Sequence, residues 1–190
     1  PWWHDWSILT PGATPAMYEN AYYTDDPASV DRRTAGWPQV LWLNEPGRFN
    51  DFAEDTAIVI RQFKAANPHV KVYGFGNVAR IADYLAAYTD AGGPTLDGYH
   101  FHAYTGSATD WEIIWDDFRS IAGDKPIVLT EFGGWSMSTP EPEHMRIMDA
   151  VRKTLDTDSQ LQAAAWFCTR PYQASWWGNS LLDYLGHITP

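Results

Sequence analysis

Residues 125–135 read KPIVLTEFGGW. This short apolar run of β-preferring residues lies between Pro126 and a pair of glycines, which predicts a buried parallel strand rather than a helix. Glu131 falls where the strand ends, and a carboxylate so close to a core requires a partner or solvent. Taken alone, Glu131 fits either a functional carboxylate or a salt-bridged or solvated residue at the start of a loop.

A second apolar strand ends in the same way. Residues 39–46 read QVLWLNEP, so that Asn44, Glu45 and Pro46 follow the strand. In retaining glycoside hydrolysis one carboxylic acid protonates the leaving oxygen while a second carboxylate attacks the anomeric carbon, and the two groups lie about 5 Å apart. Two buried strands that each deliver a glutamate provide this pair. Glu45 and Glu131 are therefore the candidate catalytic residues.

The remainder of the chain alternates between strand-like and helix-like patterns. The strand-like runs are at 2–9, 16–23, 70–75, 97–104 and 162–169, and the main amphipathic runs are at 51–66, 78–88, 110–121 and 139–155. Such alternation predicts a parallel sheet with helices outside it. No strand is followed by a G-x-G-x-x-G fingerprint, and polar residues gather at strand carboxyl ends. Both observations favour an α/β fold of the TIM-type (β/α) barrel, with residues 1–190 forming a single catalytic domain.

The helical periodicity also predicts individual side-chain positions. Phe52 is expected on the inward face of the run at 51–66, and Met145 on the inward face of the run at 139–155. Asp110 is expected to cap the helix that follows it, and Gly123 is expected to end that helix.

Composition limits the classes of partner. The formal net charge of −11 argues against nucleic acid and anionic membranes, because phosphate binding requires a basic footprint. No apolar run is long enough to span a bilayer. The single cysteine, Cys168, excludes an internal disulfide and a multi-thiolate metal site. The eleven tryptophans and ten tyrosines suit both core packing and stacking on the apolar faces of sugars.

Several side chains near the two glutamates are candidate substrate-binding residues. His100, His102 and Tyr104 alternate on one strand face, with Tyr104 nearest the carboxyl end; His100 is expected in the core. Asn44 is placed to hold a sugar hydroxyl. Trp166 is either a platform under the sugar or part of the core. The weaker candidates for the wall of a cleft are Trp3, Trp6 and Trp135.

His100 and His102 also suggest a rival class of enzyme. An H-x-H pair on a barrel strand binds zinc in metal-dependent amidohydrolases, together with further His and Asp ligands. His4 and Asp5 could serve as further ligands, but no later strand end supplies a histidine, and this interpretation leaves both glutamates unexplained. We therefore expect neither a metal nor an organic cofactor.

Three motifs together resemble the clan A glycoside hydrolases: LNEP at 43–46, HAY at 102–104 and TEFG at 130–133. The resemblance covers about residues 37–170 and implies a (β/α)8 barrel. In that clan the Asn-Glu pair ends the fourth strand, the nucleophile ends the seventh, and a tryptophan commonly ends the eighth. The opening WWHDWS and the small size are most similar to glycoside hydrolase family 128, compact barrels that act on β-1,3-glucans.

The resemblance implies a role for each matching residue. Glu45 becomes the acid/base, Asn44 the residue that holds a hydroxyl, Glu131 the nucleophile and Trp166 the sugar platform, while the HAY motif lies beside the nucleophile. The expected function is a retaining endo-β-1,3-glucanase that acts as a monomer on polysaccharide or oligosaccharide outside the cell.

The chain departs from the clan pattern in one respect. The clan has three strands before the acid/base strand, whereas this chain offers two candidates. Either a first strand is missing or the barrel is incomplete. An incomplete barrel exposes a sheet edge, and it leaves open the alternative of an inactive carbohydrate-binding barrel.

Overall fold

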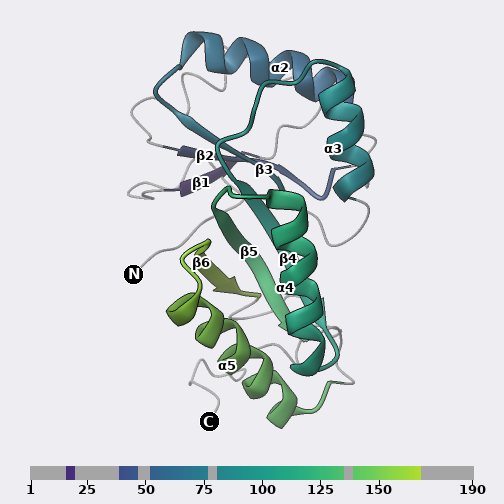
Figure 1. Ribbon diagram of the computed structural model, residues 1–190, viewed down its shortest axis with the longest axis vertical. Coiled ribbons are helices and arrows are strands. Elements are labelled where there is room, and N and C mark those ends of the chain that lie inside the picture. Colours follow the sequence, from purple (N-terminus) through teal and green to yellow (C-terminus); the bar gives the residue numbers. More distant parts are fainter. Residues whose placement is uncertain (1–15, 20–38, 47–51, 77–80, 135–138, 168–190) are drawn as a thin grey trace, which may run out of the picture. The chain divides into compact units, whose positions relative to one another are not determined.

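The computed structural model describes residues 16–19, 39–46, 52–76, 81–134 and 139–167 of the chain (Figure 1). The chain divides into two compact units, Pro1–His100 and Phe101–Pro190. The strand candidate at 2–9 lies outside the described residues. Within the described part of the chain, no helix combines the length and the apolar character needed to cross a membrane.

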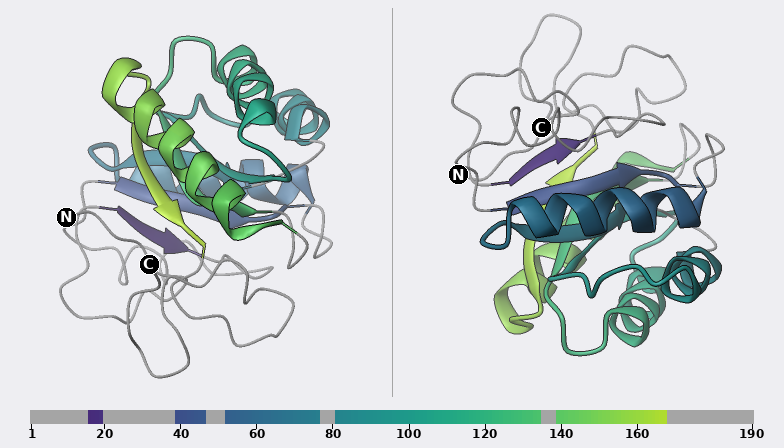
Figure 2. Two further views of the ribbon diagram at one scale, coloured as in Figure 1. Left: turned by 90° about the horizontal axis from the view of Figure 1, so that it is seen from below. Right: turned by 90° about the horizontal axis from the view of Figure 1, so that it is seen from above.

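The first unit is built on a three-stranded parallel sheet. Strands β1 (Ala16–Glu19), β2 (Gln39–Asn44) and β3 (Lys71–Gly76) follow one another in that order. Helix α2 (Ala53–Ala66) joins β2 to β3, and α3 (Ile81–Asp90) follows β3. Figures 1 and 2 show α2 running over one face of this sheet. The helical connection is what a parallel pair of strands requires.

Aromatic side chains fill the space between this sheet and its helices. The rings of Trp42 and Phe63 lie 5.2 Å apart between their centroids. The ring of Phe75 meets Tyr84 and Tyr88 edge-on, at 5.1 and 5.3 Å. Such edge-to-face pairs add to the stabilisation from burial alone, so they fix α2 and α3 over the sheet.

Charged side chains form hydrogen bonds around the segment that follows α3 in the first unit. Arg61 on α2 donates to the carbonyls of Ala91 and Gly92, at 3.1 and 2.7 Å, and so binds the turn that directly follows α3. Gly92 has a φ of 72°, which suits a glycine at a helix end. Asp97 accepts from Lys64 at 2.5 Å and from the backbone N–H of Val72 at 2.9 Å.

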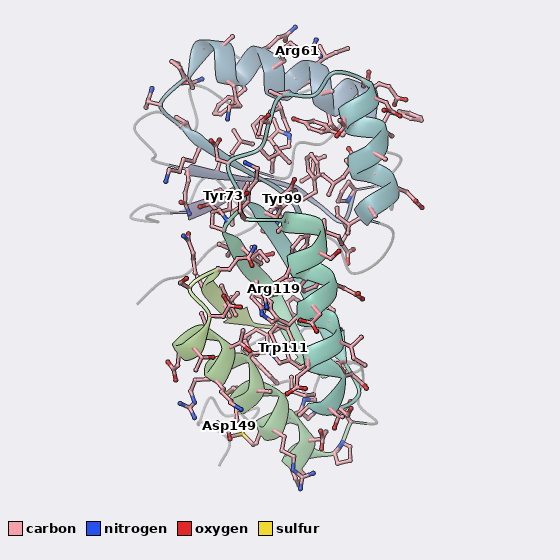
Figure 3. The ribbon with its side chains drawn as sticks, viewed as in Figure 1. Arg61, Tyr73, Tyr99, Trp111, Arg119 and Asp149 are labelled. Atoms are coloured by element: carbon pink, nitrogen blue, oxygen red, sulfur yellow. The ribbon has the colours of Figure 1, made fainter. Side chains whose placement is uncertain are left out.

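Two tyrosines of the first unit are labelled in Figure 3: Tyr73 within β3, and Tyr99 at the start of β4 (Tyr99–Thr105). The ring of Tyr73 occupies the space beside Gly98, where an added Cβ would lie 2.3 Å from Cε1 of the ring. Burial raises the pKa of Tyr73, and the negative charge of Asp97 raises it further. Burial likewise raises the pKa of Tyr99. Both phenols therefore stay protonated at neutral pH.

The second unit contains the strand that carries Glu131. Strands β4 (Tyr99–Thr105), β5 (Ile127–Gly134) and β6 (Leu161–Trp166) form a three-stranded sheet in that order; the first two residues of β4 belong to the first unit. Every residue of β5 is buried, so the predicted buried strand is confirmed. Helix α4 (Thr109–Ala122) joins β4 to β5, and α5 (Glu141–Thr157) joins β5 to β6, against which it packs.

Tryptophans join the two helices of this unit. Trp111 and Trp115 stack with their ring centroids 5.8 Å apart on α4. Nε1 of Trp111 donates to Thr154 of α5 at 2.8 Å, and Nε1 of Trp115 donates to Asp158 at 3.1 Å. Figure 3 shows Trp111 facing the side of α4 that is turned toward α5. Both indole rings are thus buried while their Nε1–H groups keep a hydrogen-bond acceptor.

Three of the local expectations are wrong. Phe52 is 63% exposed because it precedes α2 in an extended conformation and so does not follow the helical periodicity. Met145 is 49% exposed, because the inward stripe of α5 runs through His144 and Ile147. Asp110 lies within the first turn of α4, which begins one residue earlier with Ala108 as its N-cap.

The end of α4 and the fold class agree with the predictions from the sequence. Gly123 ends α4 with a φ of 63°, as a glycine at a helix terminus does. Strands and helices alternate in both units, which confirms the α/β class. Closure of the strands into a barrel and the single catalytic domain stay predictions.

Candidate active site

Glu131 is the fifth of the eight residues of β5, so the strand runs on past the glutamate to Gly134 instead of ending there as the sequence predicts. The side chain of Glu131 is only 6% exposed. The neighbouring strand β4 brings two side chains to it. The hydroxyl of Tyr104 donates a hydrogen bond to Oε2 of Glu131, and Nδ1 of His102 lies 3.4 Å from the same oxygen. His102 is itself buried. The alternation of His102 and Tyr104 on one strand face, expected from sequence, thus brings both groups to one carboxylate oxygen.

This arrangement favours an ionised carboxylate. A phenol that donates a hydrogen bond to a carboxylate stabilises the charged form. A carboxylate that is kept ionised and oriented by fixed neighbours suits a nucleophile or an electrostatic stabiliser better than a proton donor.

Trp166 ends β6 on the far side of β5 from β4. It is the register partner of Phe132, and the two rings meet edge-on at a centroid distance of 5.2 Å. The backbone N–H of Phe167 donates to the carbonyl of Phe132 at 2.8 Å, and the ring of Phe167 meets Tyr104 edge-on at 5.8 Å. An aromatic cluster from three strands therefore surrounds the end of the strand that carries Glu131.

Sequence reasoning missed Phe132 and Phe167 as members of this cluster. Phe132 is in the quoted TEFG motif, directly after the glutamate, and Phe167 directly follows the tryptophan. Their positions next to two chosen residues were the available signal. Their partners depend on the register of β5 and β6, which is irregular between Leu129 and Phe132.

Glu45 lies in the first unit, just after β2. Its backbone N–H donates to the carbonyl of Gly76 at the end of β3. Leu43 has a φ of 61° and Glu45 a φ of 48°, so both non-glycine residues occupy the left-handed region. Such conformations cost energy and cluster at functional sites. Asn44 lies between them, and its backbone is in register with Gly76.

The candidate residues are therefore placed as follows. Glu131, His102, Tyr104 and Trp166 belong to the second unit, where they are grouped around the carboxyl ends of the three strands. Asn44 and Glu45 belong to the first unit, and their approach to Glu131 stays a prediction. Trp3, Trp6 and Trp135 lie outside the described residues.

His100 occupies a core position, as expected. It is fully buried, and its Nε2 lies 3.0 Å from the carbonyl oxygen of Trp42. One nitrogen of the proposed H-x-H pair is thus engaged with the backbone. Among the residues that the structure describes, no group of three or more His, Cys, Asp or Glu side chains is arranged to hold a metal ion.

A polar network fixes the loop that follows Tyr104. The hydroxyl of Thr105 accepts from the backbone N–H of Ser107 at 3.2 Å. Glu143, in the first turn of α5, accepts from the backbone N–H of Ala108 at 2.7 Å and from Arg146 at 2.9 Å. The backbone hydrogen bond, and then Arg146, hold the pKa of Glu143 below its ordinary value. A carboxylate from one helix thus caps the start of the other.

Comparison with known families and structures extends this picture. The sequence profile of the glycosyl hydrolase catalytic core matches residues 1–190 of the chain. No curated protein is significantly similar to it in sequence. Solved structures that are similar in fold include two endo-β-1,3-glucanases and one exo-β-1,3-glucanase.

All three structures belong to glycoside hydrolase family 128. A subgroup II endo-β-1,3-glucanase from Sorangium cellulosum is 20% identical, with a TM-score of 0.78, over 99% of this chain and 86% of that one. A subgroup V exo-β-1,3-glucanase from Cryptococcus neoformans is 21% identical, with a TM-score of 0.71, over 96% and 77%. A subgroup I endo-β-1,3-glucanase from Amycolatopsis mediterranei, in complex with laminaritriose, is 20% identical, with a TM-score of 0.68, over 96% and 84%.

At this level of identity the likeness establishes a shared fold. The resemblance inferred from the LNEP, HAY and TEFG motifs is confirmed by the profile match and by these structures together.

Proposed function

Since the chain belongs to the glycosyl hydrolase catalytic core family, we propose that it is a retaining endo-β-1,3-glucanase. The observation that carries the proposal is the contact of Tyr104 and His102 with one oxygen of the buried Glu131. The similarity in fold to β-1,3-glucanases, one of them bound to laminaritriose, supports the choice of linkage.

The proposed reaction is a double displacement. Glu131 attacks the anomeric carbon while Glu45 protonates the glycosidic oxygen, which breaks the glycosidic bond and gives a covalent glycosyl-enzyme. Glu45 then removes a proton from water, the water attacks the same carbon, and Glu131 is released as the carboxylate. Two inversions leave the sugar with its original β configuration.

The neighbouring residues support these two steps. Tyr104 donates to Oε2 of Glu131, which orients the carboxylate and favours its ionised form before attack, and His102 lies beside the same oxygen. Asn44, next to Glu45, would hold a sugar hydroxyl. Trp166 would lie under the sugar and stack on its apolar face. The reaction requires neither a metal nor an organic cofactor.

The polymeric substrate suggests where the enzyme acts. A β-1,3-glucan is a large neutral polysaccharide, compatible with the acidic net charge of −11. We propose that the protein works outside the cell as a monomer.

The decisive experiment measures reducing sugars released from laminarin and from a panel of other β-glucans. Wild type is compared with Glu131→Ala and Glu45→Gln, and with Glu112→Gln as the control at an exposed glutamate of α4. We expect hydrolysis of laminarin by wild type and control, and losses of about 10⁴-fold or more in the two variants.

Two further readouts separate the parts of the proposal. The ¹H NMR spectrum of the first product should show the β anomer; an α anomer would refute retention. Products from reduced laminari-oligosaccharides should come from internal bonds; release of single glucose units from one end would indicate exo action. If wild type hydrolyses only another glycan, the proposed substrate is wrong and the proposed mechanism stands. If a folded wild type hydrolyses no glycan, the alternative of an inactive carbohydrate-binding barrel is favoured.

A further inference from the structure

The buried residue His144 has no role in the proposed double displacement. It lies in the first turn of α5 and is 5% exposed, whereas Met145, the next residue, is 49% exposed. A histidine that is turned into the interior of a small unit occupies a place that an apolar residue would ordinarily take. Its surroundings indicate why an imidazole is there.

One side of the imidazole lies directly against β5. A Cβ added to Gly134 would lie 2.2 Å from Cε1 of His144 and 2.6 Å from its Nδ1. Real atoms do not approach so closely, so the ring occupies the space that any side chain at Gly134 would need. Gly134 ends the strand that carries Glu131. The imidazole is therefore seated on the backbone at the end of that strand.

Another edge of the imidazole contacts Trp166. The two rings meet edge-on, with a centroid distance of 5.9 Å and an interplanar angle of 74°. Phe132 provides a second edge-on contact to the same indole, at 5.2 Å and 90°. Two rings from different elements, one on β5 and one on α5, thus contact the indole of Trp166. A tryptophan whose ring is contacted by rings from two different elements has few other orientations available.

We propose that His144 is a positioning residue, which holds the indole of Trp166 in the orientation that binds the sugar. The role of Trp166 as the sugar platform rests on the proposed function. His144 acts by packing between Gly134 and Trp166, and it does not contact the reacting atoms. The imidazole is planar and smaller than the phenyl ring of phenylalanine, and it contacts both the strand backbone at Gly134 and the indole of Trp166.

A role in core packing alone makes a different prediction from a positioning role. Loss of a core filler lowers the free energy of unfolding and leaves the kinetics of the folded enzyme unchanged. Loss of a positioning residue weakens binding in the ground state and the transition state alike, which raises KM while kcat stays nearly constant. If His144 acts through Trp166, the effect must also vanish when the indole is absent.

The kinetic test is a double-mutant cycle with laminari-oligosaccharides as substrate. We expect His144→Ala to raise KM about 3- to 10-fold, in keeping with the worth of an aromatic pair, and to change kcat less than about twofold. In a Trp166→Ala background, His144→Ala should change KM less than about twofold. His69→Ala, at an exposed histidine of the first unit, is the control. An unchanged KM in His144→Ala would overturn the proposal. So would a double variant whose increase in KM equals the product of the increases in the two single variants.

A spectroscopic test does not depend on activity. In protein labelled with 5-fluorotryptophan, the ¹⁹F resonance of Trp166 is identified by its absence in Trp166→Phe. His144→Ala and the milder His144→Asn should both move or broaden this resonance and leave that of Trp111 in place. A Trp166 resonance that stays in place in a folded variant refutes the positioning role. If wild type hydrolyses no glucan, the proposed function fails, and the ¹⁹F spectrum still decides whether His144 holds Trp166.

Discussion

The phenol of Tyr104 donates to Oε2 of Glu131 across neighbouring strands of one sheet. Both residues are positioned by regular backbone rather than by loops, and the ring of Tyr104 is supported edge-on by Phe167. The carboxylate is thus oriented before any substrate arrives. Sites built on regular elements hold their geometry more tightly than sites on loops.

Removal of this phenol should slow the chemical step. Tyr104→Phe keeps the ring and its packing but loses the donor to Glu131, so we expect kcat to fall about 10- to 100-fold with little change in KM. Tyr99→Phe, the same substitution on the same strand, is the control and should leave kcat within about twofold. Equal rates for Tyr104→Phe and wild type would show that this hydrogen bond does not assist the reaction.

The addition of a methyl group should destabilise the protein at one glycine, Gly98, and have almost no effect at another, Gly106. Gly98→Ala forces a Cβ to within 2.3 Å of the ring of Tyr73, and overpacking of this kind costs about 1–3 kcal/mol. Gly106→Ala meets no atom within 4 Å and should change stability by less than about 0.5 kcal/mol. Urea denaturation of both variants measures the difference; similar midpoints would contradict the close approach of Tyr73.

Glu143 should make stability depend on pH in the acid range. Its folded-state pKa is lowered from the ordinary value of 4.5, chiefly by the hydrogen bond from Ala108. The stabilisation by Glu143 is therefore fully present above the ordinary, unfolded-state pKa of 4.5. It is lost as the pH falls through the lower pKa of the folded state. Glu143→Gln should lower the urea midpoint at pH 7, and the difference from wild type should shrink toward pH 3.

A matched control separates the cap from a surface charge. Asp156 pairs with Arg152 at an exposed position of the same helix, and such pairs contribute little. Asp156→Asn should leave both the midpoint and its pH dependence nearly unchanged. An equal response in the two variants would assign the effect to overall charge.

The bond between α4 and α5 should be measurable as a coupling energy. Nε1 of Trp111 donates to Oγ1 of Thr154 at 2.8 Å, and a hydrogen bond of this kind contributes about 1 kcal/mol. Trp111→Phe and Thr154→Val, alone and together, form a double-mutant cycle of unfolding free energies. A coupling near about 1 kcal/mol is expected, whereas strict additivity would show that the two groups do not interact.

Much of the fold follows from short-range patterns. The apolar run before Glu131 predicts β5 because four consecutive β-preferring residues next to a proline leave little room for a helix. The pairing of His102 and Tyr104 with Glu131 follows from period-two alternation on a neighbouring strand. These features depend on local chemistry that is visible in the sequence.

The remaining features depend on contacts between distant residues. Hydrophobic periodicity favours Met145 over His144 as an inward residue, and only the space over Gly134 shows why the imidazole lies inside. The cap of α4 comes from Glu143 on another helix rather than from Asp110. The pairing of Trp166 with Phe132 depends on irregular register in β5 and β6, which no periodic pattern predicts.

The left-handed conformation of Glu45 has an evolutionary consequence. A non-glycine residue there costs roughly 1–2 kcal/mol, so replacement by glycine or asparagine should make the protein more stable and, under the proposed mechanism, would remove the acid/base. Mutational drift in a lineage that no longer needs the activity would therefore favour loss of this glutamate. Under the proposed mechanism, selection for hydrolysis would keep a strained residue at this position, and related chains with glycine or asparagine there should prove to be stable sugar binders.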